Sequence, residues 1–159
     1  RLEESAPYRV KGTAVFMTSS MKVTPPILLH HFKHNKMLHE KVILLTIVTE
    51  GVPEVAKRDR VEVRELQHGF SEVIAHYGFM QTPNVPLALR RAAELGLEFD
   101  PNAVSYFLGR ETVLTTGKSG LARWRKSLFV YLALNARPAN AFFRIPPNRV
   151  IELGAQVEI

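Results

Sequence analysis

The chain has 159 residues, of which 46% are hydrophobic and 23% charged, and 21 Lys+Arg against 15 Asp+Glu give a formal charge of +6. These values are ordinary for a globular domain and argue against disorder, collagen and coiled coil. The absence of cysteine excludes a disulfide scaffold, thiol catalysis and cysteine-ligated metal centres. We therefore expect residues 1–159 to form one basic domain.

The first elements are predicted to form a parallel βαβ unit. Residues 10–19 have a short apolar centre typical of a buried strand. Two prolines behind Thr24 predict a helix with Thr24 as its N-cap, running to about Asn35. The β-branched run 41–49 predicts a central strand, and strand, helix and strand in this order favour a right-handed parallel crossover.

The rest of the chain predicts a hairpin, helices and a terminal strand. The pattern indicates two hairpin strands at 60–67 and 70–79 and a helix at 85–95 that is ended by glycine. Two further strands are predicted at 104–108 and 112–115, an amphipathic helix at 121–135 and a last strand at 149–159. The expected fold class is therefore α/β. It is a mixed sheet with flanking helices, in which a βαβ unit precedes a β-hairpin, helices and a C-terminal strand.

Neither a membrane span nor a secretory leader is predicted. The longest uninterrupted apolar run, 128–134, is far shorter than the roughly 20 residues that cross a bilayer. The sequence opens with Arg-Leu-Glu-Glu and has no apolar stretch behind it. Because it also lacks an initiator methionine, we expect it to be a soluble piece of a longer protein.

The positive charge is concentrated in two windows. Residues 5–39 and 112–151 contain no acid, whereas the part between them is nearly neutral. The second window holds the cations Arg123, Arg125 and Lys126 near the start of a predicted helix, where the helix dipole is already positive. An anionic partner such as a phosphate, a lipid headgroup or an acidic protein would offset that repulsion. The alternative is an ordinary solvated basic surface.

No motif supports a metal site. His30 and His34 stand one helical turn apart, a spacing that allows two imidazoles to share a metal ion. However, no third ligand is evident and Lys33 and Lys36 would repel a cation, so hydrogen bonding to neighbouring loops is the simpler interpretation.

No motif supports catalysis either. Residues 116–119, Thr-Gly-Lys-Ser, resemble the tail of a phosphate-binding loop, but Thr112 stands where that loop needs glycine. No nucleophile elbow surrounds Ser19 or Ser20, and no carboxylate pair suits glycoside chemistry. We therefore predict no enzymatic activity, no cofactor and no nucleic-acid partner.

Several ordered blocks of the sequence resemble one family. They are KGTAVFMTS, PPILLHHFKHNKMLHE, VILLTIVTE, YGFMQTPNVP, SYFLGRET and FFRIPPNRVIELGAQVEI, at 11–19, 25–40, 42–50, 77–86, 105–112 and 142–159. Taken together they resemble the cytoplasmic C-terminal domain of the Kup-type potassium uptake transporters, the KUP/HAK/KT family.

The resemblance implies a regulatory or assembly domain on the cytoplasmic side of the plasma membrane. Its parent would take up potassium, in many members coupled to protons, through an N-terminal transmembrane domain that lies outside this sequence. The residues that coordinate the ion or couple protons would therefore lie outside it too. The resemblance also implies a homodimer, contact with the transmembrane domain of the same chain, and in some relatives binding of cyclic di-AMP.

An alternative hypothesis is a sensor of an anionic nucleotide. Crevices form at the carboxyl ends of parallel strands in open α/β sheets. Thr18 and Ser19 end the first predicted strand, His31 lies on the crossover helix, and Arg110 follows the strand near 105–108. These four residues are the predicted ligand contacts. A nucleotide cyclase is the weakest hypothesis, because no metal-binding carboxylates are evident.

Overall fold

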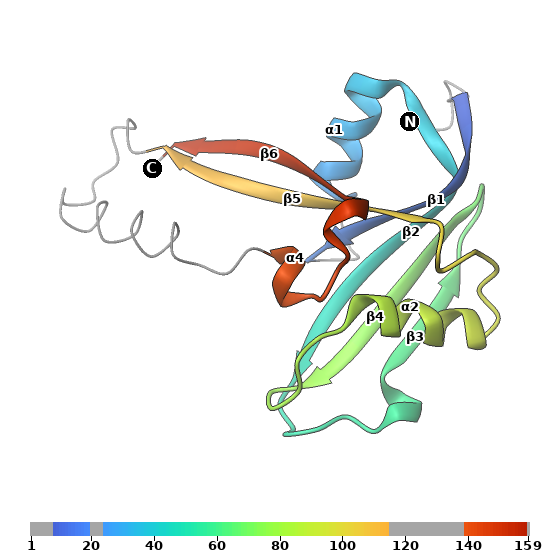
Figure 1. The fold of residues 1–159 in the computed structure, drawn as a ribbon, viewed down its shortest axis with the longest axis vertical. Helices are drawn as coiled ribbons and strands as arrows, with labels where there is room; N and C mark the ends of the chain where they lie inside the picture. The colour runs from blue at the N-terminus through green and yellow to red at the C-terminus, as the bar shows by residue number, and fades with distance from the viewer. Residues whose placement is uncertain (1–7, 20–23, 115–138, 159) are drawn as a thin grey trace.

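The computed structural model describes residues 8–19, 24–114 and 139–158 (Figure 1). Its strands are β1 (Tyr8–Thr18), β2 (Met37–Glu50), β3 (Val61–Glu65), β4 (Phe70–Gly78), β5 (Val104–Leu114) and β6 (Val150–Glu158). Its helices are α1 (Pro26–Asn35), α2 (Val85–Glu94), the short α4 (Ala139–Phe142) and the 3₁₀ turns η1 (Lys57–Asp59) and η2 (Pro147–Arg149). In the part of the chain described, no helix is long and apolar enough to cross a membrane.

The described strands form a single mixed sheet in the order β3-β4-β2-β1-β5-β6. The neighbours from β4 to β6 are parallel, and β3 pairs antiparallel with β4. The predicted α/β class, the parallel βαβ unit and the hairpin are thus confirmed. β1 lies in the interior of the sheet, with β2 on one side and β5 on the other (Figure 1).

The two longer helices cover opposite faces of this sheet. Alternate residues of a strand point to opposite faces. Val15 of β1 belongs to the core packed under α2, whereas its neighbours Ala14 and Phe16 belong to the core packed under α1. The larger core adds Ile43, Leu45, Val73, Ala75, Val85, Leu89 and Tyr106. The smaller core adds Ile27, Leu28, Leu38, Val42 and Phe107.

Helix α1 is held by packing rather than by capping. Its N-cap is Pro25 and not the predicted Thr24, because proline at position 26 restricts the preceding residue to the extended backbone seen there, with φ −56° and ψ 129°. No side chain caps this end, a loss of about 1 kcal/mol. Burial of Ile27 and Leu28 contributes roughly 1.5–3 kcal/mol each and outweighs it.

Strand β5 is continuous where two strands were predicted. The sequence interpretation ended one strand at Leu108, before Gly109, and began another near residue 112. Gly109 instead pairs with Leu153 in a parallel ladder that runs to Leu114. The presence of β6 as a partner, which no local pattern reveals, makes the strand continuous. The predicted helix 121–135 lies outside the described residues.

A close backbone contact joins the loops at the carboxyl ends of β2 and β4. The Phe79 N–H donates to the Val52 carbonyl over 3.0 Å, and the Met80 N–H donates to the Pro53 carbonyl over 3.1 Å. A Cβ atom added at Gly78 would lie only 2.2 Å from the Pro53 carbonyl oxygen. Backbone atoms cannot move aside as a flexible side chain can, so this position requires glycine.

We therefore expect Gly78→Ala to lower the free energy of unfolding by about 3 kcal/mol, the upper end of overpacking costs. Urea unfolding monitored by circular dichroism measures the change. Gly51→Ala is the matched control, because a Cβ there meets nothing within 4 Å, and it should stay within about 0.5 kcal/mol of the parent. Equal stability of the two variants would contradict the packing argument.

Candidate functional site

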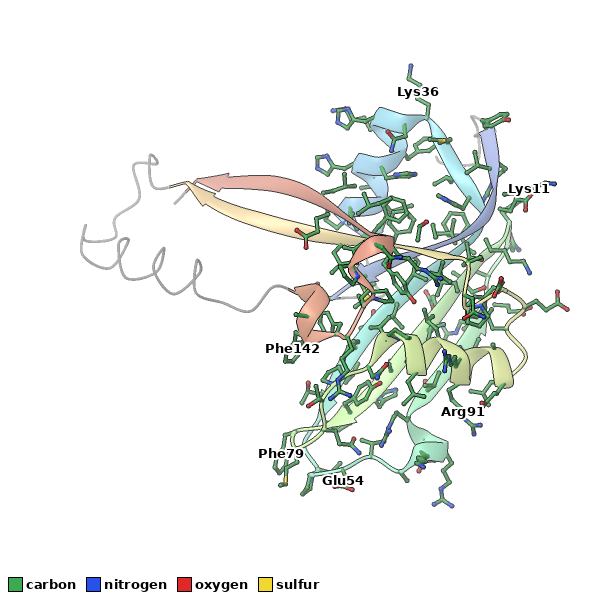
Figure 2. The ribbon with its side chains drawn as sticks, viewed as in Figure 1. Lys11, Lys36, Glu54, Phe79, Arg91 and Phe142 are labelled. Atoms are coloured by element: carbon green, nitrogen blue, oxygen red, sulfur yellow. The ribbon has the colours of Figure 1, made fainter. Side chains whose placement is uncertain are left out.

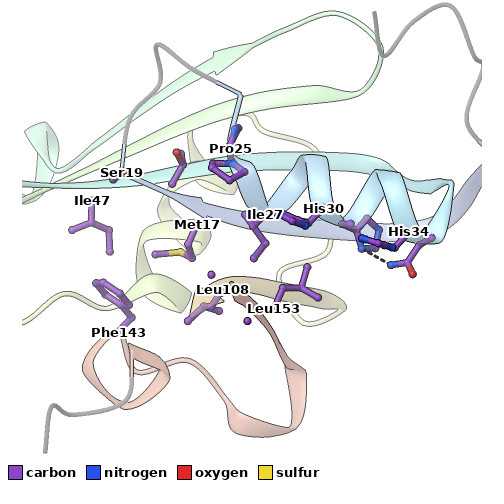
Figure 3. Close-up of a pocket in the computed structure, with 16 residues that line it drawn as sticks. Met17, Ser19, Pro25, Ile27, His30, His34, Ile47, Leu108, Phe143 and Leu153 are labelled. Carbon is purple, nitrogen blue, oxygen red and sulfur yellow. Dashed lines mark hydrogen bonds between the residues drawn. The ribbon is translucent and has the colours of Figure 1, made fainter. Parts of the chain in front are cut away.

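A cleft of about 820 Å³ opens between α1, the carboxyl-terminal end of β1 and the middle of β5 and β6 (Figure 3). β1 and the residue after it contribute Met17, Thr18 and Ser19, β2 contributes Ile47, and the segment after α4 contributes Phe143. The remaining lining residues are Pro25, Pro26, Ile27, His30, His31, His34, Asn35, Leu108, Gly109, Leu153 and Gly154. This is the place where α/β sheets commonly bind ligands, outside the carboxyl ends of parallel strands next to a crossover helix.

One side of the cleft is apolar and the other carries polar groups. Met17, Ile47 and Phe143 lie together on one side of the cleft (Figure 3). Leu108 belongs with them to the larger core, whereas Leu153 packs against the smaller core under α1. Polar groups come from the end of β1 and from α1. A ligand that fits both kinds of wall has a flat apolar part and a polar or charged part.

The structure brings together three of the four predicted ligand contacts. Thr18, Ser19 and His31 all line the cleft. Arg110 follows the lining residue Gly109 in β5, and its backbone pairs with Gly154. The Arg110 side chain is outside the described part of the structure. The predicted basic surface of Arg123, Arg125 and Lys126 lies outside the described residues altogether.

The sequence interpretation missed the apolar side of the cleft. Met17, Ile47 and Phe143 belong to three separate segments, and each reads locally as a core residue. Met17, Ile47 and Phe143 come together only because of the order of the strands in the sheet and the position of the segment between α4 and β6. The predicted strand end at Leu108 could have suggested Leu108 and Gly109, because Phe107 pairs with Phe16 and the residues that follow them therefore lie beside the end of β1.

His31 is the most unusual polar residue of the cleft. Its side chain points from α1 toward the sheet, is only 4% exposed, and packs edge-on against Phe16 and Phe107 at centroid distances of 5.6 and 4.7 Å. Its Nδ1 lies 2.9 Å from the Asn35 amide one turn later. Its Nε2 is buried and has no hydrogen-bond partner. A buried polar atom without a partner costs free energy.

A second imidazole lies beneath the same helix. The half-buried His39 of β2 has its ring centroid 6.4 Å from that of His31, and its Nδ1 is also buried without a partner. Burial lowers the pKa of His31 below its ordinary 6.5, and the charge of His39 lowers it further. Burial lowers the pKa of His39 as well. Both rings are therefore neutral at neutral pH and can accept or donate one hydrogen bond.

The N-terminal end of α1 has no negative group of its own. Its first turn contains no acid and its N-cap makes no side-chain hydrogen bond. The positive end of the helix dipole therefore faces the cleft beside Thr18 and Ser19 without compensation, an arrangement that favours an anionic group. Together with the apolar wall, it suits an anion attached to an apolar or aromatic body.

His30 and His34 lie on the rim of the cleft. Their rings stack at a centroid distance of 6.2 Å, and both side chains are exposed. No group of three potential metal-ligating side chains occurs within residues 8–19, 24–114 and 139–158.

The two buried imidazoles predict a pH-dependent stability. Because folding lowers both pKa values, the unfolded chain binds protons more readily than the folded chain below the ordinary value of 6.5. We expect the free energy of unfolding to fall as the pH is lowered from about 7.5 to about 5.5, in urea titrations at each pH. The variant His31→Phe/His39→Phe should flatten this dependence, whereas His30→Asn/His34→Asn should retain it. An unchanged slope in the first variant would contradict the assignment.

Comparisons with known proteins agree along the whole chain. The family described as "K+ potassium transporter C-terminal domain" matches residues 11–159. A "Probable potassium transport system protein Kup" of Myxococcus xanthus (strain DK1622) is 56% identical over 153 residues, which are 96% of this chain and 23% of the relative. "Probable potassium transport system protein Kup 1" of Geobacter sulfurreducens is 50% identical over 162 residues, 99% of this chain and 26% of the relative.

A third relative, a Kup protein of Anaeromyxobacter sp. (strain Fw109-5), is 52% identical over 158 residues, 96% of this chain and 24% of the relative. The chain thus spans about a quarter of the length of the curated relatives it matches. No solved structure matches it significantly. On the extent of the family match and these identities, the chain belongs to the C-terminal domain family of the Kup potassium transporters.

Proposed function

We propose that this chain is the regulatory and assembly domain of a Kup-type potassium uptake transporter, on the cytoplasmic side of the plasma membrane. The carrying observation is the family match over residues 11–159, with relatives named as potassium transport proteins. The parent takes up potassium together with protons. The domain itself is not an enzyme, in keeping with relatives that are named for transport rather than for a reaction.

Assembly as a homodimer is supported by the outer part of the sheet. β1 pairs with β5 only as far as Phe107, so from Leu108 to Leu114 the one described neighbour of β5 is β6. This two-stranded parallel ribbon extends away from the body of the domain (Figure 1). Two-stranded ribbons are marginally stable alone, and parallel strands are usually covered on both faces. A second copy of the chain would cover part of this ribbon.

The regulatory proposal predicts a defect in a truncated transporter. In cells deficient in potassium uptake, we expect the Myxococcus Kup protein without the segment matching this chain to lose part of its uptake, its regulation or its oligomeric state. Potassium uptake and the mass of the purified transporter measure these properties. If membrane levels are equal and all three properties are unchanged in the truncated protein, the proposal fails.

A second candidate function is binding of an anionic nucleotide in the cleft. The specific observation in its favour is the buried, unpartnered His31 Nε2 in a cleft that also contains the uncapped N-terminus of α1. Thr18 and Ser19 would contact the phosphate, and the apolar wall would hold the base. Cyclic di-AMP has this combination of charge and flat rings, and ATP is the natural comparison.

Calorimetry with a cleft-filling variant tests this candidate. A Cβ at Gly109 meets no described atom within 4 Å and Gly109 lines the cleft, so Gly109→Leu places an apolar side chain in the candidate site. We expect binding of cyclic di-AMP or ATP at low salt to the parent chain, and at least tenfold weaker binding to this variant. Gly51→Leu, at another open position, is the control and should bind like the parent. Absence of heat for both nucleotides would refute this candidate and leave the assembly role untouched.

A further inference from the structure

The outer face of α1 carries cations and one apolar side chain. Leu29, Lys33 and Lys36 follow one another at intervals of four and three residues, which places them along one side of the helix and its C-cap. All three are exposed. Leu29 is 45% exposed, whereas the preceding Leu28 is buried at 1%, so the helix separates a core-facing side from a solvent-facing side.

The surroundings of this face add positive charge and an aromatic ring. Lys11 of β1 is exposed, and Lys11 and Lys36 lie at the end of the molecule where β1 begins (Figure 2). Tyr8, the first residue of β1, is 75% exposed. We call Tyr8, Lys11, Leu29, Lys33 and Lys36 the α1 surface.

The stretch of sequence that contains the α1 surface has no acid, although the pairing of β1 with β2 places Glu40 across from Lys11. Residues 5–39 contain no acid, and the next along the chain is Glu40, which is exposed. Among the described residues, none of the ion pairs involves Lys11, Lys33 or Lys36. By contrast, Lys41, Arg58, Arg64 and Arg91 each have a carboxylate within ion-pair distance. The α1 surface therefore keeps its cations available.

We propose that the α1 surface docks on an anionic phospholipid surface. Lysines near an anionic leaflet each strengthen binding about fivefold. Exposed leucine and tyrosine side chains suit the boundary between headgroups and acyl chains. Lys33 lies on α1, Lys36 is its C-cap and Lys11 lies on β1, and none of the three lines the cleft, so charge complementarity with a broad, negative surface is the property they share. The proposal rests on the proposed function, because attachment to a transporter would keep the domain beside a membrane.

Lys11, Lys33 and Lys36 by themselves give only a moderate affinity for an anionic membrane. Attachment of the domain to a membrane protein strengthens the binding. A transporter domain attached at the start of β1 meets the bilayer at a high effective concentration, so a weak contact suffices. Tyr8 and Lys11 lie at that start. Docking through α1 would place the cleft, which uses the opposite edge of the same helix, close to the membrane surface.

Vesicle flotation tests the proposal with the 159-residue chain. The probes are vesicles of phosphatidylglycerol with phosphatidylethanolamine and vesicles of phosphatidylcholine alone. We expect binding to the first kind only. Raising the salt from about 0.1 M to about 1 M shortens the screening length from about 10 Å to about 3 Å and should release the chain. Equal binding to both kinds of vesicle, or no binding to either, overturns the proposal.

Two pairs of matched variants locate the contact. Lys33→Gln/Lys36→Gln and Lys57→Gln/Arg58→Gln remove the same charge from opposite parts of the molecule. The first should weaken binding about 25-fold and the second by less than about fivefold. Leu29→Ser should weaken binding more than Leu87→Ser, which changes a comparably exposed leucine of α2. Circular dichroism confirms that each variant is folded.

The outcomes distinguish lipid docking through α1 from a general effect of net charge and from the proposed regulatory function. Equal loss in both charge variants would indicate a response to net charge only and would overturn a docking role for α1. If the truncated transporter behaves normally but the vesicle results are as expected, the regulatory role fails and the lipid contact stands. If vesicles are not bound but truncation impairs uptake, the lipid contact fails and the proposed function stands.

Discussion

The packing of β1 between β2 and β5 is the constraint on which the rest of the domain depends. β1 is hydrogen-bonded on both sides, and its central residues Ala14, Val15 and Phe16 are fully buried on alternating faces. Phe16 stacks on Phe107 of β5 with ring centroids 4.6 Å apart, and α1 packs over this pair. The same strand thus fixes both cores, the position of the crossover helix and the edge at which the cleft opens.

The cleft is a consequence of that packing. Helix α1 is seated by Ile27, Leu28 and His31, and its lack of a cap leaves the helix dipole uncompensated at the end of β1. His31 fills space against Phe16 and Phe107, which is favourable for the apolar part of its ring but leaves Nε2 without a partner. A buried nitrogen without a hydrogen-bond partner lowers the stability of the domain.

Helix α1 links the two proposed interactions. Its inner side belongs to the smaller core, one edge borders the cleft, and its outer side carries Leu29, Lys33 and Lys36. The chain continues from α1 into β2 after a single residue, which fixes the C-terminal end of the helix against the sheet. In a transporter of the Kup family, a helix held in this way would relate the occupancy of the cleft to the position of the domain on the membrane.

The sequence by itself determined the α/β class, the βαβ unit and the 68–69 hairpin turn, because each depends on hydrophobic periodicity or turn chemistry within a short segment. The sequence also sufficed to predict that Thr18, Ser19 and His31 lie close together, because the end of a strand and the crossover helix that follows it meet at the same edge of a parallel sheet. Only the tertiary structure decided the continuity of β5 through Gly109, since that depends on pairing with β6 more than forty residues later. It alone joined Met17, Ile47 and Phe143 into one wall, because contacts between distant segments are set by packing rather than by local pattern.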